Sequence, residues 1–118
     1  MNRKILGDCG EEAVAQFLKS KNFKIITQNY LTRYGEIDLI AQKDDILAFI
    51  EVKTRKTVHF PISNVVTWRK QQKIVKTAKY YIIQNNIINK ACRFDIATVI
   101  QSNNGYEVDY LENAFLGR

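Results

Sequence analysis

The segment "GEIDLIAQKDDILAFIEVKTR", Gly35 to Arg55, constrains the fold more than any other part of this chain. Residues 35–42 and 46–55 are rich in aliphatic side chains and flank the polar turn "KDD", which predicts two antiparallel strands joined in a hairpin. Asp38, Glu51 and Lys53 nevertheless place charge in strands that are expected to be buried. These charged positions need a reason other than stability.

The register of the hairpin brings two carboxylates together. If the loop consists of two residues, 44–45, it determines which residues face one another along the whole hairpin. Asp38 then falls opposite Glu51, and Glu36 falls opposite Lys53. Two carboxylates with Cβ atoms about 5 Å apart repel one another, and burial adds the loss of their hydration. A positive group is therefore expected between them, either Lys53 or a divalent cation.

The residue types favour a magnesium site. Mg²⁺ is typically held by one or two carboxylates and keeps several water molecules. We expect Asp38, Glu51 and the backbone carbonyl of Val52 to bind it, with Mn²⁺ as a substitute and Glu11 as a third carboxylate. Lys53 would orient or deprotonate a water, or stabilise negative charge on a phosphate. The simpler interpretation, a solvated Glu51–Lys53 ion pair on an edge strand, is disfavoured by the opposed Asp38.

The remaining pattern predicts an α/β fold. Apolar residues recur at helical spacing over residues 4–20. A long second helix is expected to start at a cap on Ser63 or Asn64 and to end near Asn85. Further strands are predicted at 23–31, 92–100 and 106–115. The order helix–strand–strand–strand–helix–strand–strand predicts a central mixed sheet with helices covering its faces.

Size and composition narrow the class of protein. A chain of 118 residues fits one domain, residues 1–118. Cys9 and Cys92 are too few for a disulfide framework and lack CxxC spacing, which favours a reducing, cytoplasmic setting. No segment resembles a signal peptide or a membrane span, so no membrane partner is expected. His59 is the only histidine, which argues against zinc.

The charge distribution indicates a polyanionic partner. Lys and Arg number 18 against 12 Asp and Glu, and no acidic residue occurs between Glu51 and Asp95. The second helix carries a face of a single charge sign, which suits a phosphate backbone. The cations expected to bind nucleic acid are Arg55, Arg69, Lys70, Lys73 and Lys76. Glu36 and Gln71 are further candidates to support the site, although Gln71 is equally well explained as a satisfied core amide.

Two motifs, "GEIDLI" at 35–40 and "FIEVKTR" at 49–55, resemble those of the PD-(D/E)-x-K nuclease superfamily. Nearly the whole chain resembles the uncharacterised bacterial YraN-like family, whose members are similar to archaeal Holliday junction resolvases. Further matches are Gly7, Glu11, "KQQKIVKTA" at 70–78, "RFD" at 93–95 and "NAF" at 113–115. The chain departs from the expected pattern at Phe60-Pro61, where a glycine is expected after the aromatic residue.

The resemblance implies a restriction-endonuclease-like α/β/α sandwich and a single endonuclease-like domain. It also implies a helix glutamate at Glu11, metal carboxylates at Asp38 and Glu51, and a catalytic lysine at Lys53.

The leading hypothesis is a Mg²⁺-dependent nuclease that hydrolyses structured or branched DNA rather than RNA. Cutting two strands symmetrically would favour a homodimer. The first alternative is a nucleic-acid-binding module with a vestigial site. The second is an interaction protein that docks on an acidic partner through its basic helix.

Overall fold

Seven elements make up the part of the chain that the structure, a computed structural model, describes: residues 3–55, 66–103 and 105–117. The helices are α1 (Arg3–Ser20) and α2 (Trp68–Gln84), and the strands are β1 (Lys24–Thr32), β2 (Gly35–Lys43), β3 (Ile46–Arg55), β4 (Ala91–Ser102) and β5 (Gly105–Phe115). This order confirms the predicted α/β fold. Neither helix in these ranges is long and apolar enough to cross a membrane.

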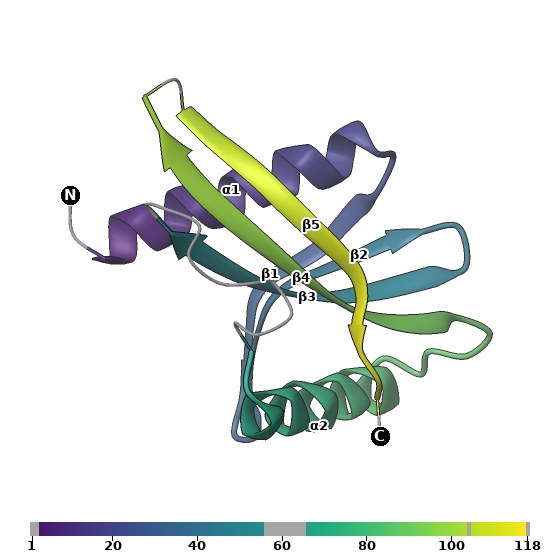
Figure 1. The fold of residues 1–118 in the computed structure, drawn as a ribbon. Helices are drawn as coiled ribbons and strands as arrows, with labels where there is room; N and C mark the ends of the chain where they lie inside the picture. The colour runs from purple at the N-terminus through teal and green to yellow at the C-terminus, as the bar shows by residue number, and fades with distance from the viewer. Residues whose placement is uncertain (1–2, 56–65, 104, 118) are drawn as a thin grey trace.

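The strands form one mixed sheet in the order β1-β2-β3-β4-β5 (Figure 1). All neighbouring strands are antiparallel except β3 and β4, which are parallel. A hairpin cannot join parallel neighbours, and α2 lies in the crossover between β3 and β4.

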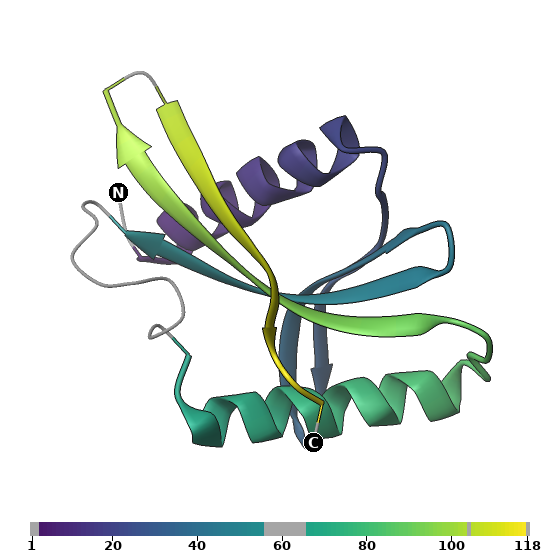
Figure 2. The ribbon, with the colours of Figure 1, turned by 45° about the vertical axis from the view of Figure 1, so that its right-hand side comes forward.

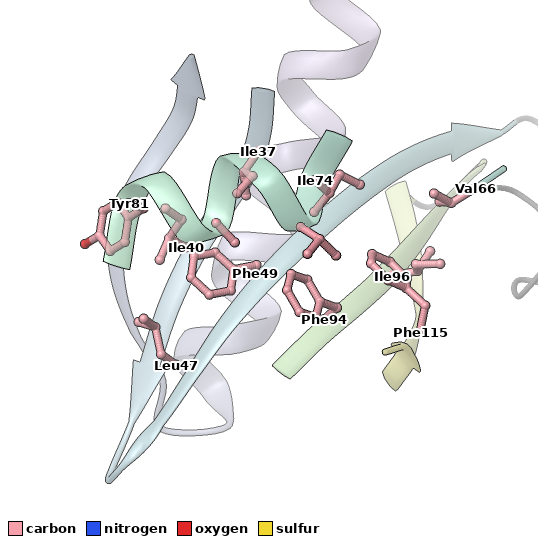
Figure 3. Packing of buried hydrophobic residues seen from close by; sticks show 12 residues of the cluster. Ile37, Ile40, Leu47, Phe49, Val66, Ile74, Tyr81, Phe94, Ile96 and Phe115 are labelled. Atoms are coloured by element: carbon pink, nitrogen blue, oxygen red, sulfur yellow. The ribbon is translucent and has the colours of Figure 1, made fainter. Parts of the chain in front are cut away.

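Each face of the sheet is covered by one helix (Figure 2). Because side chains alternate along a strand, Leu47 and Phe49 of β3 pack with α2, while Ala48 and Ile50 pack with α1. In the core under α2, the rings of Phe49 and Phe94 stack with centroids 5.6 Å apart (Figure 3). Full burial of an aliphatic or aromatic side chain stabilises the fold by roughly 1.5–3 kcal/mol. The predicted α/β/α layering is confirmed.

Helix α2 begins later than predicted. Its N-cap is Thr67, whose hydroxyl accepts a hydrogen bond of 3.2 Å from the backbone N–H of Lys70. A cap at Ser63 or Asn64 was therefore wrong, because residues 66 and 67 are not helical. Threonine is itself a favoured N-cap residue, which explains the start of the helix at Trp68. Residues 56–65, which include Phe60-Pro61, lie outside the described part of the chain.

The β2–β3 hairpin has the predicted register at its turn but opens farther along. Lys43 pairs with Ile46, and the ladder ends at the pair Leu39–Ile50. Beyond this point β2 stays paired with β1, while β3 stays paired with β4. The turn that joins β1 and β2 consequently lies beside α2 (Figure 2).

This opening changes two predicted pairs. Asp38 and Glu51 lie just beyond the end of the ladder rather than within it. Glu36 pairs with Leu31 of β1, and Lys53 pairs with Thr98 of β4. Glu36 therefore does not face Lys53. The sequence fixes the local loop and its register, but it does not reveal where competing strands draw the two halves of a hairpin apart.

Asp95 of β4 is a fully buried carboxylate that holds the end of β5. It accepts three hydrogen bonds of 3.0–3.1 Å from the Arg93 guanidinium in bidentate geometry, and a bond of 2.5 Å from the Tyr110 hydroxyl. The backbone N–H of Asn113 also donates to Asp95, at 3.0 Å. The segments "RFD" and "NAF" thus meet in one structural network beside the β4–β5 bulge at Phe94.

Removing the Asp95 carboxylate should strongly destabilise the fold, because the mostly buried Arg93 would lose its bidentate partner and keep a 3.8 Å ion pair with the exposed Glu112. We expect Asp95→Ala to lower the free energy of unfolding by about 3–5 kcal/mol, measured by urea denaturation. Asp109→Asn, at an exposed position of β5, is the control and should change it by less than about 0.5 kcal/mol. A similar small effect at Asp95 would contradict the role of this network.

Candidate active site

Asp38 and Glu51 lie directly beyond the last pair of the β2–β3 ladder, one on each strand. The Asp38 Oδ2 atom accepts a hydrogen bond of 2.8 Å from the backbone N–H of Val52. The Asp38 carboxylate thus takes the place of a main-chain acceptor at the point where β2 leaves β3. In an extended strand the N–H and C=O of one residue point to the same side, so the Val52 carbonyl also faces this opening.

The Glu51 carboxylate is buried and surrounded by positive charge. Its side chain is 4% exposed, and its Oε1 atom lies 2.9 Å from the Nζ of Lys70 and 3.4 Å from the Nζ of Lys53. Lys53 comes from the same strand, whereas Lys70 reaches the carboxylate from α2. Burial alone would penalise an ionised glutamate, and the two ammonium groups offset that penalty.

Asp38 lies in an excess of negative charge. Burial is the main reason that the pKa of Asp38 rises to about 7, followed by the negative charge of Glu51. The hydrogen bond from Val52 opposes this rise, and the charges of Glu11 and Glu36 add to it. Near neutral pH this carboxyl group can therefore hold a proton, and a bound cation would favour its ionised form.

Lys70 occupies a position different from that of the other cations of α2. Its side chain is 45% exposed, and its ammonium group contacts Glu51. Burial lowers the pKa of Lys70, but the hydrogen bond and attraction to Glu51 outweigh this effect and leave the pKa raised. Its predicted contact with nucleic acid stays a prediction, because part of its surface remains open to solvent.

Helix α1 brings Glu11 toward the site through a close approach at Gly10. A Cβ atom on Gly10 would collide with the Thr54 hydroxyl of β3, so glycine lets the helix lie directly against this side chain. Glu11 is half-buried, and its charge contributes to the raised pKa of Asp38. Glu11 therefore lies within electrostatic range of Asp38.

The described residues contain no group of three Asp, Glu, His or Cys side chains placed to hold a metal ion. The donors at the opening are the Asp38 and Glu51 carboxylates and the Val52 carbonyl. These hard oxygen donors fit a Mg²⁺ ion that keeps several waters, rather than a cage made only of protein ligands. Glu11 as a third ligand stays a prediction.

No direct hydrogen bond joins the two candidate supporting residues to the carboxylates among the described contacts. Gln71 donates from Nε2 to the Val66 carbonyl at 3.1 Å, beside the start of α2. Its amide nitrogen thus has a hydrogen-bond partner within the protein, as expected for the alternative of a satisfied core amide. Glu36 is exposed on the β1–β2 hairpin and acts on Asp38 through its charge.

Sequence reasoning missed Thr98. It pairs with Lys53 in the parallel ladder and is 7% exposed. Its hydroxyl has no hydrogen-bond partner among the described residues. An unsatisfied buried hydroxyl costs about 1–3 kcal/mol, and this one lies beside Lys53 in the parallel ladder. The signal in the sequence is a polar residue within the apolar run "IATVI" at 96–100, but locating it beside Lys53 requires the strand pairing.

The basic face of α2 is solvent-exposed at Arg69, Lys73 and Lys76, and Arg55 is exposed at the end of β3. Helix α2 contains no acidic residue, and Arg69 and Lys70 lie in its first turn. Cations are unfavourable near the N-terminus of a helix. This arrangement therefore lowers helix stability and favours an anionic partner.

Comparison with known proteins identifies relatives along almost the full chain. Residues 10–99 match the profile of a family described as "Uncharacterised protein family UPF0102". A UPF0102 protein of Alkaliphilus metalliredigens is 42% identical over 113 residues, which cover 95% of this chain and 98% of the relative. One of Dictyoglomus turgidum is 42% identical over 119 residues, covering 98% and 100%. One of Clostridioides difficile is 40% identical over 117 residues, with the same coverage. The chain therefore belongs to the UPF0102 family, the YraN-like family that its motifs resemble.

Proposed function

We propose that this protein is a divalent-metal-dependent nuclease that hydrolyses phosphodiester bonds in structured or branched DNA. The observation that carries the proposal is the position of Asp38 and Glu51 at the opening between β2 and β3, with Lys53 beside Glu51. The exposed cations of α2 would hold the phosphate backbone. The free thiols of Cys9 and Cys92 suit the reducing cytoplasm that we propose as its setting.

The residues at the opening have distinct roles in this proposal. Asp38, Glu51 and the Val52 carbonyl would hold Mg²⁺, or Mn²⁺ in its place, which supplies Lewis-acid activation of a phosphate and of a water. The Lys53 ammonium would donate hydrogen bonds to a phosphate oxygen and stabilise the negative charge that develops there. Lys70 would lose its attraction to Glu51 when a metal neutralises that carboxylate, and could then contact a neighbouring phosphate.

One observation favours a second candidate function, a nucleic-acid-binding module without catalysis. Lys53 and Lys70 already neutralise Glu51, so the protein can compensate this buried charge with its own groups. In that case the basic face of α2 would bind DNA, and the carboxylates would be structural. Metal-dependent cleavage separates the two functions.

The proton on Asp38 yields a test of the metal site. The folded pKa of about 7 lies above the ordinary value of 3.8, so protonation of Asp38 stabilises the folded state fully below about pH 4. This contribution is lost as the pH rises to about 7. Compared with Asp38→Asn, the wild type should lose free energy of unfolding over this range in EDTA, and Mn²⁺ should restore it near pH 8. Urea melts at several pH values would measure both effects, and parallel pH profiles would contradict them.

Substitution of Lys53 tests catalysis directly. Lys53→Met should keep metal and DNA binding but lose on the order of 10²–10⁴ in cleavage rate. Its melting temperature should change little, because Lys70 remains beside Glu51. The measurement is single-turnover cleavage of linear, flapped and four-way DNAs with Mg²⁺, Mn²⁺ or EDTA. Lys19→Met, an exposed change on α1, is the control.

Two outcomes of that assay would count against the proposal. Wild-type cleavage by Lys53→Met would remove the catalytic role of this lysine. Failure of the wild type to cut any DNA in the panel would favour the binding module.

The basic face of α2 should contribute affinity without sequence specificity. Lys73→Ala and Lys76→Ala should weaken binding to all DNAs alike. Each change should reduce the slope of log affinity against log salt by about one unit. Lys19→Ala should leave the slope unchanged, as measured by fluorescence anisotropy. Binding that does not respond to salt would show that this face is only a solvated surface.

A further inference from the structure

A groove of about 530 Å³ lies between the β1–β2 turn and the start of α2. Its cations are Arg33, Arg69, Lys73 and Lys76, its aromatic residues are Tyr34 and Trp68, and none of the described residues that line it is acidic. We call it the Trp68 groove. Its volume is within the range of pockets that hold small ligands.

Gly35 allows the turn and the helix to approach closely enough to form this groove. A Cβ atom on Gly35 would lie 3.1 Å from the Thr77 Oγ1 and 3.6 Å from the Lys73 Cβ. The φ angle of Gly35 is +152°, a backbone conformation that residues other than glycine rarely adopt. The two walls of the groove are therefore held in contact by the fold.

The two aromatic residues of the groove differ in how firmly neighbouring side chains hold them. Trp68 is 73% exposed, although most of its surface is apolar. Tyr34 is held in place: the Arg33 guanidinium lies 5.0 Å from its ring centroid and donates a hydrogen bond of 2.8 Å to its hydroxyl. The Tyr80 ring packs against Tyr34 with centroids 5.5 Å apart. One aromatic wall is thus fixed, and the other offers an open ring face.

We propose that the Trp68 groove binds an unpaired nucleic-acid strand, with a base stacked on the Trp68 indole and phosphates on the four cations. Grooves that bind single strands combine aromatic platforms with positive charge in this way. Paired bases hide their faces in the helical stack, whereas an unpaired base presents one. An acidic peptide would use the cations but would leave the indole without a matching flat surface. This inference rests on the nucleic-acid function proposed above and narrows its substrate.

The position of the groove relates it to the candidate active site. Successive residues of a helix are rotated by about 100°, so Lys70 is a neighbour of Arg69 and Lys73 around α2. Lys70 contacts Glu51, while Arg69 and Lys73 line the groove. A strand in the groove would pass beside the carboxylates. The proposed substrate class is therefore DNA in which an unpaired strand adjoins a duplex.

Trp68 is the only tryptophan of the chain, so its fluorescence reports on the groove directly. The test titrates the full chain in EDTA with oligothymidylate, with a blunt duplex and with an abasic strand of the same length. We expect oligothymidylate to quench the emission and the abasic strand and the blunt duplex to leave it unchanged. Binding to labelled strands is then compared by anisotropy for wild type, Trp68→Ala and Trp68→Phe.

Loss of one stacked base should lower affinity for oligothymidylate roughly 5- to 100-fold in Trp68→Ala. Trp68→Phe should retain most of the affinity, and blunt-duplex affinity should stay unchanged in both variants. Ile83→Ala, a change at another exposed apolar side chain of α2, is the matched control and should have no effect. Circular dichroism would confirm that each variant is folded.

Several results would overturn the inference. Equal quenching by all three nucleic acids, or unchanged strand affinity in Trp68→Ala, would show that no base stacks on Trp68. Quenching by anionic lipid vesicles but not by oligothymidylate would assign the groove to a membrane surface. Binding of duplex DNA with no role for Trp68 would reject this inference and leave the proposed function intact, whereas no binding to any nucleic acid would reject both.

Discussion

The site depends on the end of the β2–β3 ladder at Leu39 and Ile50. From there β3 stays paired with β4 up to Arg55, while β2 stays paired with β1, so the sheet opens between them. Backbone groups that lose a ladder partner need another acceptor or donor. Asp38 meets this need for the Val52 N–H, and the same divergence brings the β1–β2 turn to α2. The carboxylate site and the Trp68 groove are therefore two consequences of one opening.

Electrostatics then determines which side chains gather at this opening. A buried carboxylate is stable only with positive or hydrogen-bonding partners. Glu51 takes Lys53 from its own strand and Lys70 from α2. Asp38 lies close to Glu51 and has its pKa raised by burial and by that neighbouring charge. The lysines lie beside Glu51 and leave Asp38 with little compensating charge. An added cation between the two carboxylates would therefore stabilise both of them.

The sequence predicted those features that depend on local rules. Loop length gave the register at Lys43 and Ile46, and alternation within β3 put Glu51 and Lys53 on one face. Residues outside the local segment decided the rest. The parallel pairing with β4 separates Glu36 from Lys53 and sets Thr98 beside that lysine. The sequence placed Lys70 among the cations expected to bind nucleic acid, but the reach of its long side chain toward Glu51 depends on how α2 packs. The exposure of Trp68 likewise follows from packing.

The buried sheet carboxylates Asp95 and Glu51 show how a structural acid differs from a candidate functional one. Asp95 is held by donors with little freedom: Arg93, whose side chain is 13% exposed and binds in bidentate geometry, together with Tyr110 and a backbone N–H. Loss of these partners would remove the hydrogen bonds that hold Tyr110 and Asn113 of β5. Glu51 is instead held by two lysines that are 26% and 45% exposed. Flexible, partly solvated ammonium groups can move to another anion with little loss of packing. The similar burial of Asp95 and Glu51 therefore has different meanings, because the lysine partners of Glu51 could leave if the proposed cation and phosphate bind.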